Sequence, residues 1–209
     1  SNATKKEVLS LWSGLGYNSR ALRLYETSKI LSKKSFNSIY PNFDVLPGVG
    51  KYTKSALLSF AYEEKVITQD TNVKRIFSRF FGIENPHNFI EKNEKNILKN
   101  IKSRKFNEIL MDFGSKICTS KNPLCKECVL EANCKKFFLD TKYTHEPFKN
   151  SNREIRGKII KHLVVNESVK ISSLKELLRI EDSRIESIIK KLADEGMIHI
   201  KNKKLIEIS

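Results

Sequence analysis

All four cysteines of the chain lie in one short segment, as Cys118-x6-Cys125-x2-Cys128-x5-Cys134. Thiolates are soft metal ligands, and such short intervals let a single loop enclose one metal centre. Zinc sites with four cysteines commonly pair two Cys-x2-Cys knuckles, whereas this segment contains one. The spacing therefore favours a [4Fe–4S] cluster, with zinc and disulfides as the alternatives.

A second segment that could bind a ligand is Leu46-Pro47-Gly48-Val49-Gly50-Lys51-Tyr52-Thr53. It leads into a predicted helix over residues 51–62. Glycine permits positive φ and close backbone approach, so successive N–H groups can point at one anion, helped by the positive end of the helix. The alternative is an ordinary turn between two helices with nothing bound.

Asp70 is the third candidate. It directly precedes a run in which apolar residues recur with helical spacing, at Val73, Ile76, Phe77 and Phe80. This position predicts that the Asp70 side chain caps the N-terminus of a helix.

Hydrophobic spacing throughout the chain predicts a mainly α fold. The helical pattern lapses between about residues 137 and 152, which predicts a domain boundary there. Three amphipathic segments followed by two alternating ones indicate a winged helix-turn-helix with a small β-hairpin. The expected helices are residues 5–14, 18–33, a short one ending near 46, 51–62, one after Asp70, 88–101, 104–118, 153–166, 171–179 and 182–195, and the expected strands are 197–201 and 204–208.

The chain has 209 residues and a formal net charge of +15, which points to a polyanionic partner. Its 39% hydrophobic content can fill a core, which argues against a disordered tail or a fibre. No apolar run reaches the roughly 18 residues that span a bilayer, and no secretory start is visible. We therefore expect a cytoplasmic, nucleoid-associated protein without a membrane partner.

Over residues 5–137 the chain resembles the helix-hairpin-helix DNA glycosylases of the endonuclease III superfamily that carry a [4Fe–4S] cluster. The resemblance implies a partial glycosylase domain at 4–137, with the cluster loop at 118–134. The hydrophobic pattern and the composition, in turn, predict a linker at 138–152 and the winged-helix domain at 153–209. The resemblance also implies that the hairpin binds DNA phosphate with a monovalent cation, and that Asp70 is essential for catalysis. The DNA contacts implied at and after the hairpin are Gly48, Val49, Gly50, Lys51, Thr53 and Lys74.

Three features indicate the branch of this family. Bifunctional members place a Schiff-base lysine where this chain has Tyr52, so the chain resembles a monofunctional glycosylase. The segment from Trp12 to Ala21 resembles the motif of A/G-specific adenine glycosylases (MutY), in which Tyr17 would wedge into the base stack and Arg20 would contact DNA. Asn72 also matches the adenine enzymes, and with Tyr52 it would orient the catalytic groups.

The function that this resemblance implies is excision of adenine opposite 8-oxoguanine or guanine from double-stranded DNA, by hydrolysis of the N-glycosidic bond. The alternatives are a T/G-mismatch thymine glycosylase, which Tyr52 suits equally, and a non-enzymatic iron–sulfur regulator. Two roles are open for the winged helix: it contacts DNA through Arg184, Lys190 and Lys191, or it has a protein-docking or purely structural role. Protein partners are unknown.

The start of the chain also departs from the family pattern. Ser1-Asn2-Ala3 resembles an expression scar, so we expect an N-terminally truncated chain. Several helices of the catalytic domain, including the one with the general-acid glutamate, would precede Thr4. We therefore expect this stretch to lack excision activity by itself. A winged helix also stands where bacterial adenine glycosylases carry a Nudix-like domain.

Overall fold

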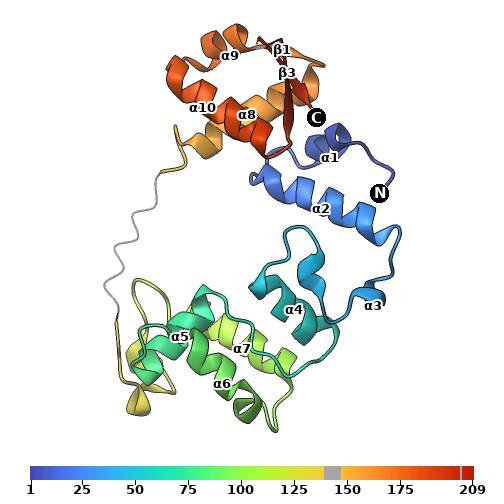
Figure 1. Cartoon of the computed structure of the whole chain (residues 1–209). Coiled ribbons are helices and arrows are strands. Elements are labelled where there is room, and N and C mark those ends of the chain that lie inside the picture. Colours follow the sequence, from blue (N-terminus) through green and yellow to red (C-terminus); the bar gives the residue numbers. More distant parts are fainter. Residues whose placement is uncertain (139–146, 203) are drawn as a thin grey trace. The chain divides into compact units, whose positions relative to one another are not determined.

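The computed structural model describes residues 1–138, 147–202 and 204–209, and it is mainly helical (Figure 1). The described chain packs as two compact units. The sheet-containing unit comprises residues 1–38, 46–48 and those from 147 onward; the cysteine-containing unit comprises residues 39–45 and 49–138. Most of the expected linker, residues 139–146, lies outside the described residues. The division into domains at 4–137 and 153–209 stays a prediction.

Helices α5 and α7 form the centre of the cysteine-containing unit and lie side by side (Figure 1). Its small apolar core consists of Ile67, Val73, Phe77, Ile90 and Leu98. Along the chain, the elements that lead into and form this unit are α3 (Phe36–Ile39), a 3-10 turn (Phe43–Val45), α4 (Lys51–Ala61), α5 (Thr71–Phe81), α6 (His87–Ile97), α7 (Ser103–Lys116) and two 3-10 turns in the cysteine segment (Cys125–Glu127 and Glu131–Asn133).

The ends of α5 follow from its sequence. Asp70 caps the N-terminus, because its side chain accepts a hydrogen bond from the Val73 N–H, which confirms the predicted cap. Gly82 ends the helix in the left-handed region at φ 71°, where a side chain would be strained. The helix therefore has fixed ends, with Asp70 at the start and the buried residues Val73, Ile76 and Phe77 along one face.

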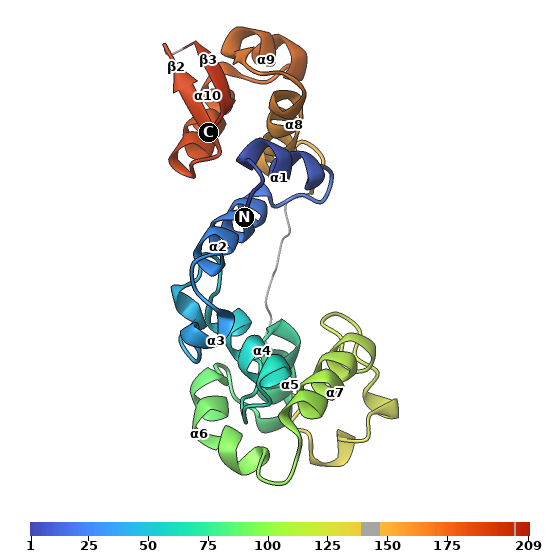
Figure 2. The same ribbon diagram turned by 90° about the vertical axis from the view of Figure 1, so that its right-hand side faces the viewer.

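The sheet-containing unit holds α1 (Lys5–Leu11), α2 (Asn18–Leu31), α8 (Asn152–Val165), β1 (Val169–Lys170), α9 (Ile171–Leu178), α10 (Asp182–Asp194), β2 (Ile198–Lys201) and β3 (Leu205–Ile208). The strands form an antiparallel sheet in the order β1-β3-β2, with Ile200 opposite Ile206. The predicted hairpin is present as β2 and β3, beside α10 (Figure 2). The two-residue strand β1 was not predicted. Three helices with such a sheet have the element order of a winged helix-turn-helix.

One continuous apolar cluster fills this unit. It includes Leu163, Leu174, Ile185, Leu192 and Ile206 from α8, α9, α10 and β3. Leu9, Ala21 and Leu22 from α1 and α2 belong to the same cluster, so the first two helices share a core with the C-terminal segment. Among the described residues, no helix is long and apolar enough to cross a membrane.

Candidate active site and metal centre

Asp70 is half-buried at the start of α5, and both of its carboxylate oxygens accept hydrogen bonds. Oδ1 accepts from the Val73 N–H at 2.7 Å, and Oδ2 accepts from Asn72 Nδ2 at 3.1 Å. Each oxygen has a second lone pair, so this geometry orients the carboxylate without using all of its acceptor capacity. Capping and a chemical role are therefore compatible.

Asn72 and Arg75 connect Asp70 to the start of the cysteine segment. Arg75 Nη2 donates to Asn72 Oδ1 at 2.7 Å, and Arg75 Nε donates to the Cys118 carbonyl at 2.8 Å. Burial lowers the pKa of the Arg75 guanidinium, and the neighbouring Arg79 cation acts in the same direction. A guanidinium nevertheless keeps its charge in proteins. Side chains and one backbone carbonyl thus link Asp70 to Cys118.

Gly114 on α7 makes this arrangement possible. A Cβ at Gly114 would lie 2.6 Å from the Cβ of Asn72, a distance that real Cβ atoms do not adopt. The Gly114 carbonyl also accepts a hydrogen bond from Arg75 Nη2 at 2.7 Å. Glycine therefore lets α5 and α7 approach closely where Asn72 orients Asp70.

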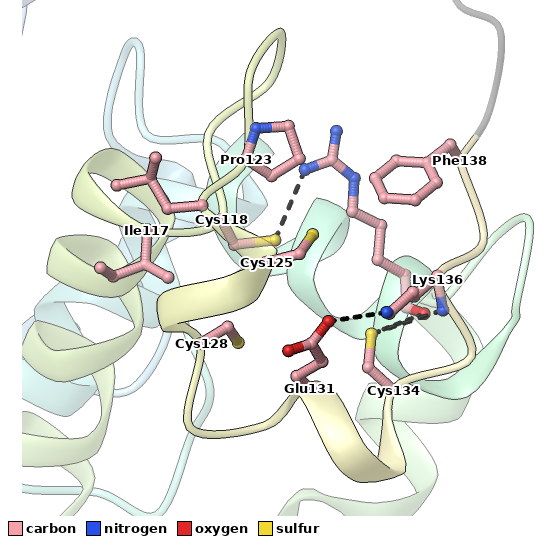
Figure 3. Close-up of a pocket in the computed structure, with 11 residues that line it drawn as sticks. Ile117, Cys118, Pro123, Cys125, Cys128, Glu131, Cys134, Lys136 and Phe138 are labelled. Carbon is pink, nitrogen blue, oxygen red and sulfur yellow. Dashed lines mark hydrogen bonds and ion pairs between the residues drawn. The ribbon is translucent and has the colours of Figure 1, made fainter.

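The four cysteines, all free and half-buried, line a single pocket (Figure 3). Arg79, at the edge of full burial, lies beside them: its Nη1 is 3.5 Å from Cys118 Sγ and donates to the Thr119 carbonyl at 2.6 Å, while Nη2 donates to the Ser120 carbonyl at 2.9 Å. A buried cation at this place offsets negative charge on thiolates and fixes the first turn of the segment.

The thiols surround the pocket without meeting at one point. Among the described residues, no three His, Cys, Asp or Glu side chains converge closely enough to hold a single metal ion. The end of the segment is tied back to α5, because the Lys135 N–H donates to the Phe80 carbonyl at 3.1 Å. Four thiols on one pocket, with a neighbouring cation, fit a sulfur-ligated centre in donor type and number.

Of the two glycines in the hairpin, Gly48 adopts a positive φ, whereas Gly50 is extended with φ −88°. Gly48 adopts φ 81°, and a Cβ there would lie 2.8 Å from Arg23 Cδ, so this position needs glycine. Helix α4 begins at Lys51 after Gly50 without a side-chain cap, and a Cβ on Gly50 would meet open space. The N–H groups of the first turn of α4 therefore face an open surface that an anion could approach.

The remaining predicted residues of this unit lie in α4 and α5, except Val49, which lies just before α4. Tyr52 is 45% exposed, and within the described chain no hydrogen bond joins it to Asp70 or Asn72. Lys51 and Lys74 are exposed, whereas Val49 and Thr53 are half-buried. The structure thus joins Asp70 and Asn72 by a hydrogen bond, and within the described residues no such bond connects Tyr52 to either of them.

In the sheet-containing unit, Tyr17 begins α2 in the left-handed region at φ 51° and is half exposed. The guanidinium carbons of Arg20 and Arg153 lie 4.8 and 3.7 Å from the centroid of its ring. Arg153 was missed because nothing in the sequence connects positions so far apart. Arg75 and Arg79 were also missed, although two arginines four residues apart on a helix with a buried apolar face could have indicated a buried anionic partner.

Comparison with known proteins shows what the chain is similar to. Residues 1–102 match the model of the HhH-GPD superfamily of base excision DNA repair proteins. Among curated proteins, the chain is 39% identical to an adenine DNA glycosylase of Buchnera aphidicola subsp. Baizongia pistaciae over 145 residues, which are 66% of this chain and 41% of the relative. It is 30% identical to the adenine DNA glycosylase of Rattus norvegicus, covering 64% of this chain and 28% of that protein. The chain thus spans less than half the length of these relatives.

Two solved structures are also similar. A thermostable thymine-DNA glycosylase is 29% identical with a TM-score of 0.57, covering 65% of this chain and 66% of its own. A trapped endonuclease III–DNA covalent intermediate has a TM-score of 0.50 at 24% identity and the same coverage, a likeness that concerns the fold alone. Adenine DNA glycosylases and a thymine-DNA glycosylase are thus similar to this chain in sequence.

Proposed function

We propose that this chain is part of a monofunctional DNA glycosylase that releases adenine paired with 8-oxoguanine or guanine. The observation that carries the proposal is the oriented Asp70 carboxylate, held by the Val73 N–H and Asn72 in a chain similar to adenine glycosylases. The net charge of +15 and the open N–H groups of the glycine hairpin support duplex DNA as the ligand.

The mechanism assigns each residue a task. The target base must leave the stack, because the glycosidic bond cannot be reached inside a duplex. Asp70 then opposes the positive charge that develops on the deoxyribose as the bond breaks, and water completes the hydrolysis. Asn72 keeps the Asp70 carboxylate oriented, and Tyr52 is assigned a supporting role. The family resemblance implies a glutamate as the proton donor for the departing base.

Outside this reaction centre, residues of both units would bind DNA or metal. Gly48, Val49, Gly50, Lys51 and Thr53 would bind a backbone phosphate with a monovalent cation, Lys74 would contact DNA, and Tyr17 with Arg20 would enter or flank the base stack. Cys118, Cys125, Cys128 and Cys134 would hold a [4Fe–4S] cluster, which would cross-link the segment as a structural staple. Arg75 and Arg79 anchor that segment to α5.

The test is Asp70→Asn in the protein restored to the length of its relatives. Asparagine is as good an N-cap as aspartate, so the helix keeps its cap while the negative charge is lost. We expect adenine release from an A:8-oxoguanine duplex to fall at least about 100-fold, with DNA binding retained. The matched control, Asp112→Asn, changes an exposed residue of α7 and should leave turnover unchanged. Normal excision by Asp70→Asn would refute the role of Asp70.

A thymine glycosylase is the second candidate, favoured by the 29% identity to a thymine-DNA glycosylase. Incubating the same protein with A:8-oxoguanine, A:G and T:G duplexes decides between the two, because the released base names the activity. Sequence-selective DNA binding without release of either base would support a regulator.

A further inference from the structure

Tyr17, which the proposed function places in the DNA base stack, is braced by the C-terminal part of the chain. The guanidinium of Arg153, in the first turn of α8, lies 3.7 Å from the centroid of the Tyr17 ring. Arg153 Nη1 also donates a hydrogen bond to the Tyr17 hydroxyl at 3.0 Å. One side chain thus contacts both the face and the tip of the tyrosine.

The turn before Tyr17 is shaped to admit this guanidinium. A Cβ on Gly16 would lie 3.2 Å from Arg153 Nη2, so a larger residue there would push against the arginine. The Gly16 carbonyl accepts a hydrogen bond from Trp12 Nε1 at 2.8 Å, which fixes the turn from the other direction. The positive φ of both Gly16 and Tyr17 then directs the ring towards α8.

The charge of Arg153 is available to a ligand. Within the described part of the chain, neither Arg20 nor Arg153 forms an ion pair with a carboxylate. Arg156 on the same helix, in contrast, is paired with Glu195 at 2.5 Å. Phe148 is 59% exposed, and its ring centroid lies 5.4 Å from the Arg153 guanidinium. Two cations and two aromatic rings therefore share one exposed surface, the combination that binds phosphates and stacks on bases.

The helix expected to contact DNA shows a different pattern. Arg184 on α10 donates to Asn152 Oδ1 at 2.9 Å and to the Asn150 carbonyl at 2.6 Å. These bonds hold the segment that leads into α8, just before Arg153. Arg184 thus supports the start of α8 from within the unit.

We propose that Arg153 is a positioning residue for Tyr17, and that through it the C-terminal segment takes part in binding duplex DNA. The inference rests on the proposed function. By holding the ring in one orientation before DNA arrives, Arg153 removes rotamer freedom that binding would otherwise have to restrict. The Arg153 guanidinium also adds positive charge beside Tyr17, where it would attract the backbone phosphates of the DNA.

The experiment measures fluorescence anisotropy of a labelled A:8-oxoguanine duplex with the 209-residue chain, for wild type, Arg153→Ala and Arg153→Lys. The planar guanidinium stacks and donates in a fixed fork, which a lysine cannot reproduce. We expect Arg153→Ala to weaken binding about threefold to tenfold and Arg153→Lys to recover less than half of that loss on a logarithmic scale. Arg156→Ala removes the same charge from the same helix without touching Tyr17, and it should change affinity less than about twofold.

A double-mutant cycle separates positioning from simple charge. In a Tyr17→Leu background, Arg153→Ala should weaken binding less than it does in wild type, because the positioning contribution is already gone and only the charge contribution remains. An equal loss in both backgrounds, or full rescue by Arg153→Lys, would overturn the positioning role. NMR of the free chain supplies a readout without DNA: the Arg153 δ-protons should carry an upfield ring-current shift that Tyr17→Leu abolishes. If that shift is present and the wild-type chain binds no duplex, the DNA role of Arg153 fails, whereas the proposed function is tested separately by base release from the longer protein.

Discussion

Each of the two units of this chain is stabilised internally by a different kind of interaction. The sheet-containing unit has one apolar cluster that runs through α1, α2, α8, α9, α10 and the sheet. The apolar core of the cysteine-containing unit is much smaller and is drawn from α5, α6 and their flanking residues. Because burial of apolar surface is the main stabilising contribution in folding, we expect the cysteine-containing unit to rely more on polar contacts.

A buried polar network supplies part of what the cysteine-containing unit lacks. Asn107 Oδ1 accepts from the Thr68 N–H at 2.9 Å, and Asn107 Nδ2 donates to Ser59 Oγ at 2.8 Å and to the Val66 carbonyl at 2.9 Å. Ser103 completes the network at 2.9 Å from Ser59 Oγ. These bonds fix residues 66–68 just before Asp70, so the unit with the smaller core places the candidate catalytic carboxylate by directional hydrogen bonds.

The largest expected effect comes from removing one cysteine. In Cys128→Ser, the proposed cluster cannot bind normally, and we expect a loss of more than about 4 kcal/mol in the stability of the cysteine-containing unit. Visible absorption should disappear, and hydrogen exchange measured by mass spectrometry should rise in α5, α7 and residues 118–137. Exchange in α8 and α10 should stay slow. The neighbouring Val129→Ala, at an 89% exposed residue, is the control. An equal rise in hydrogen exchange in both units would show that the cysteines do not stabilise the cysteine-containing unit selectively.

The next effect concerns the sheet-containing unit. Leu163 is fully buried in its apolar cluster, so Leu163→Ala creates a cavity and should cost about 3 kcal/mol. Exchange should rise throughout α8–α10, with the visible absorption of the cysteine centre unchanged. Leu177→Ala, on the exposed side of α9, should cost little. A loss of absorption in Leu163→Ala would show that the centre depends on the apolar cluster.

A smaller effect is expected from the polar network. Asn107→Ala leaves the Thr68 N–H without its partner, whereas the Val66 carbonyl keeps the hydrogen bond from Ser103 Oγ. Such an unpaired buried N–H costs about 2 kcal/mol. Because the loop before Asp70 loses its anchor, excision by the longer protein should fall more than stability alone explains. Asn96→Ala, at an exposed position of α6, is the matched control. Unchanged excision in Asn107→Ala would show that the polar network does not position Asp70.

The sequence predicted the elements that depend on local patterns and missed those that depend on distant contacts. Asp70 and the apolar spacing after it predict the cap and the buried face of α5 because both signals lie within a dozen residues. Strand β1 is too short to show alternation, and it forms because Val169 pairs with Ile206. The contact between Tyr17 and Arg153 joins residues 136 positions apart, and a single sequence does not encode such a pairing by spacing.

The smallest effect concerns charge within the small core. Burial raises the pKa of Glu94, although its Oε2 accepts a hydrogen bond from the Ile67 N–H at 3.1 Å. A carboxyl with a raised folded-state pKa stabilises the fold below its unfolded pKa, and this contribution is lost as the pH rises through the folded value. Glu94→Gln stays neutral at every pH, so it should match wild type in acid and be slightly more stable at neutral pH, by less than about 0.5 kcal/mol after solvent screening. Chemical denaturation at several pH values, read by hydrogen exchange in α6, measures this difference, with the exposed Glu84→Gln as the control. A variant less stable than wild type at neutral pH would mean that the charged hydrogen bond to Ile67 outweighs the burial of Glu94, and that this unit gains from charge where the other gains from apolar contact.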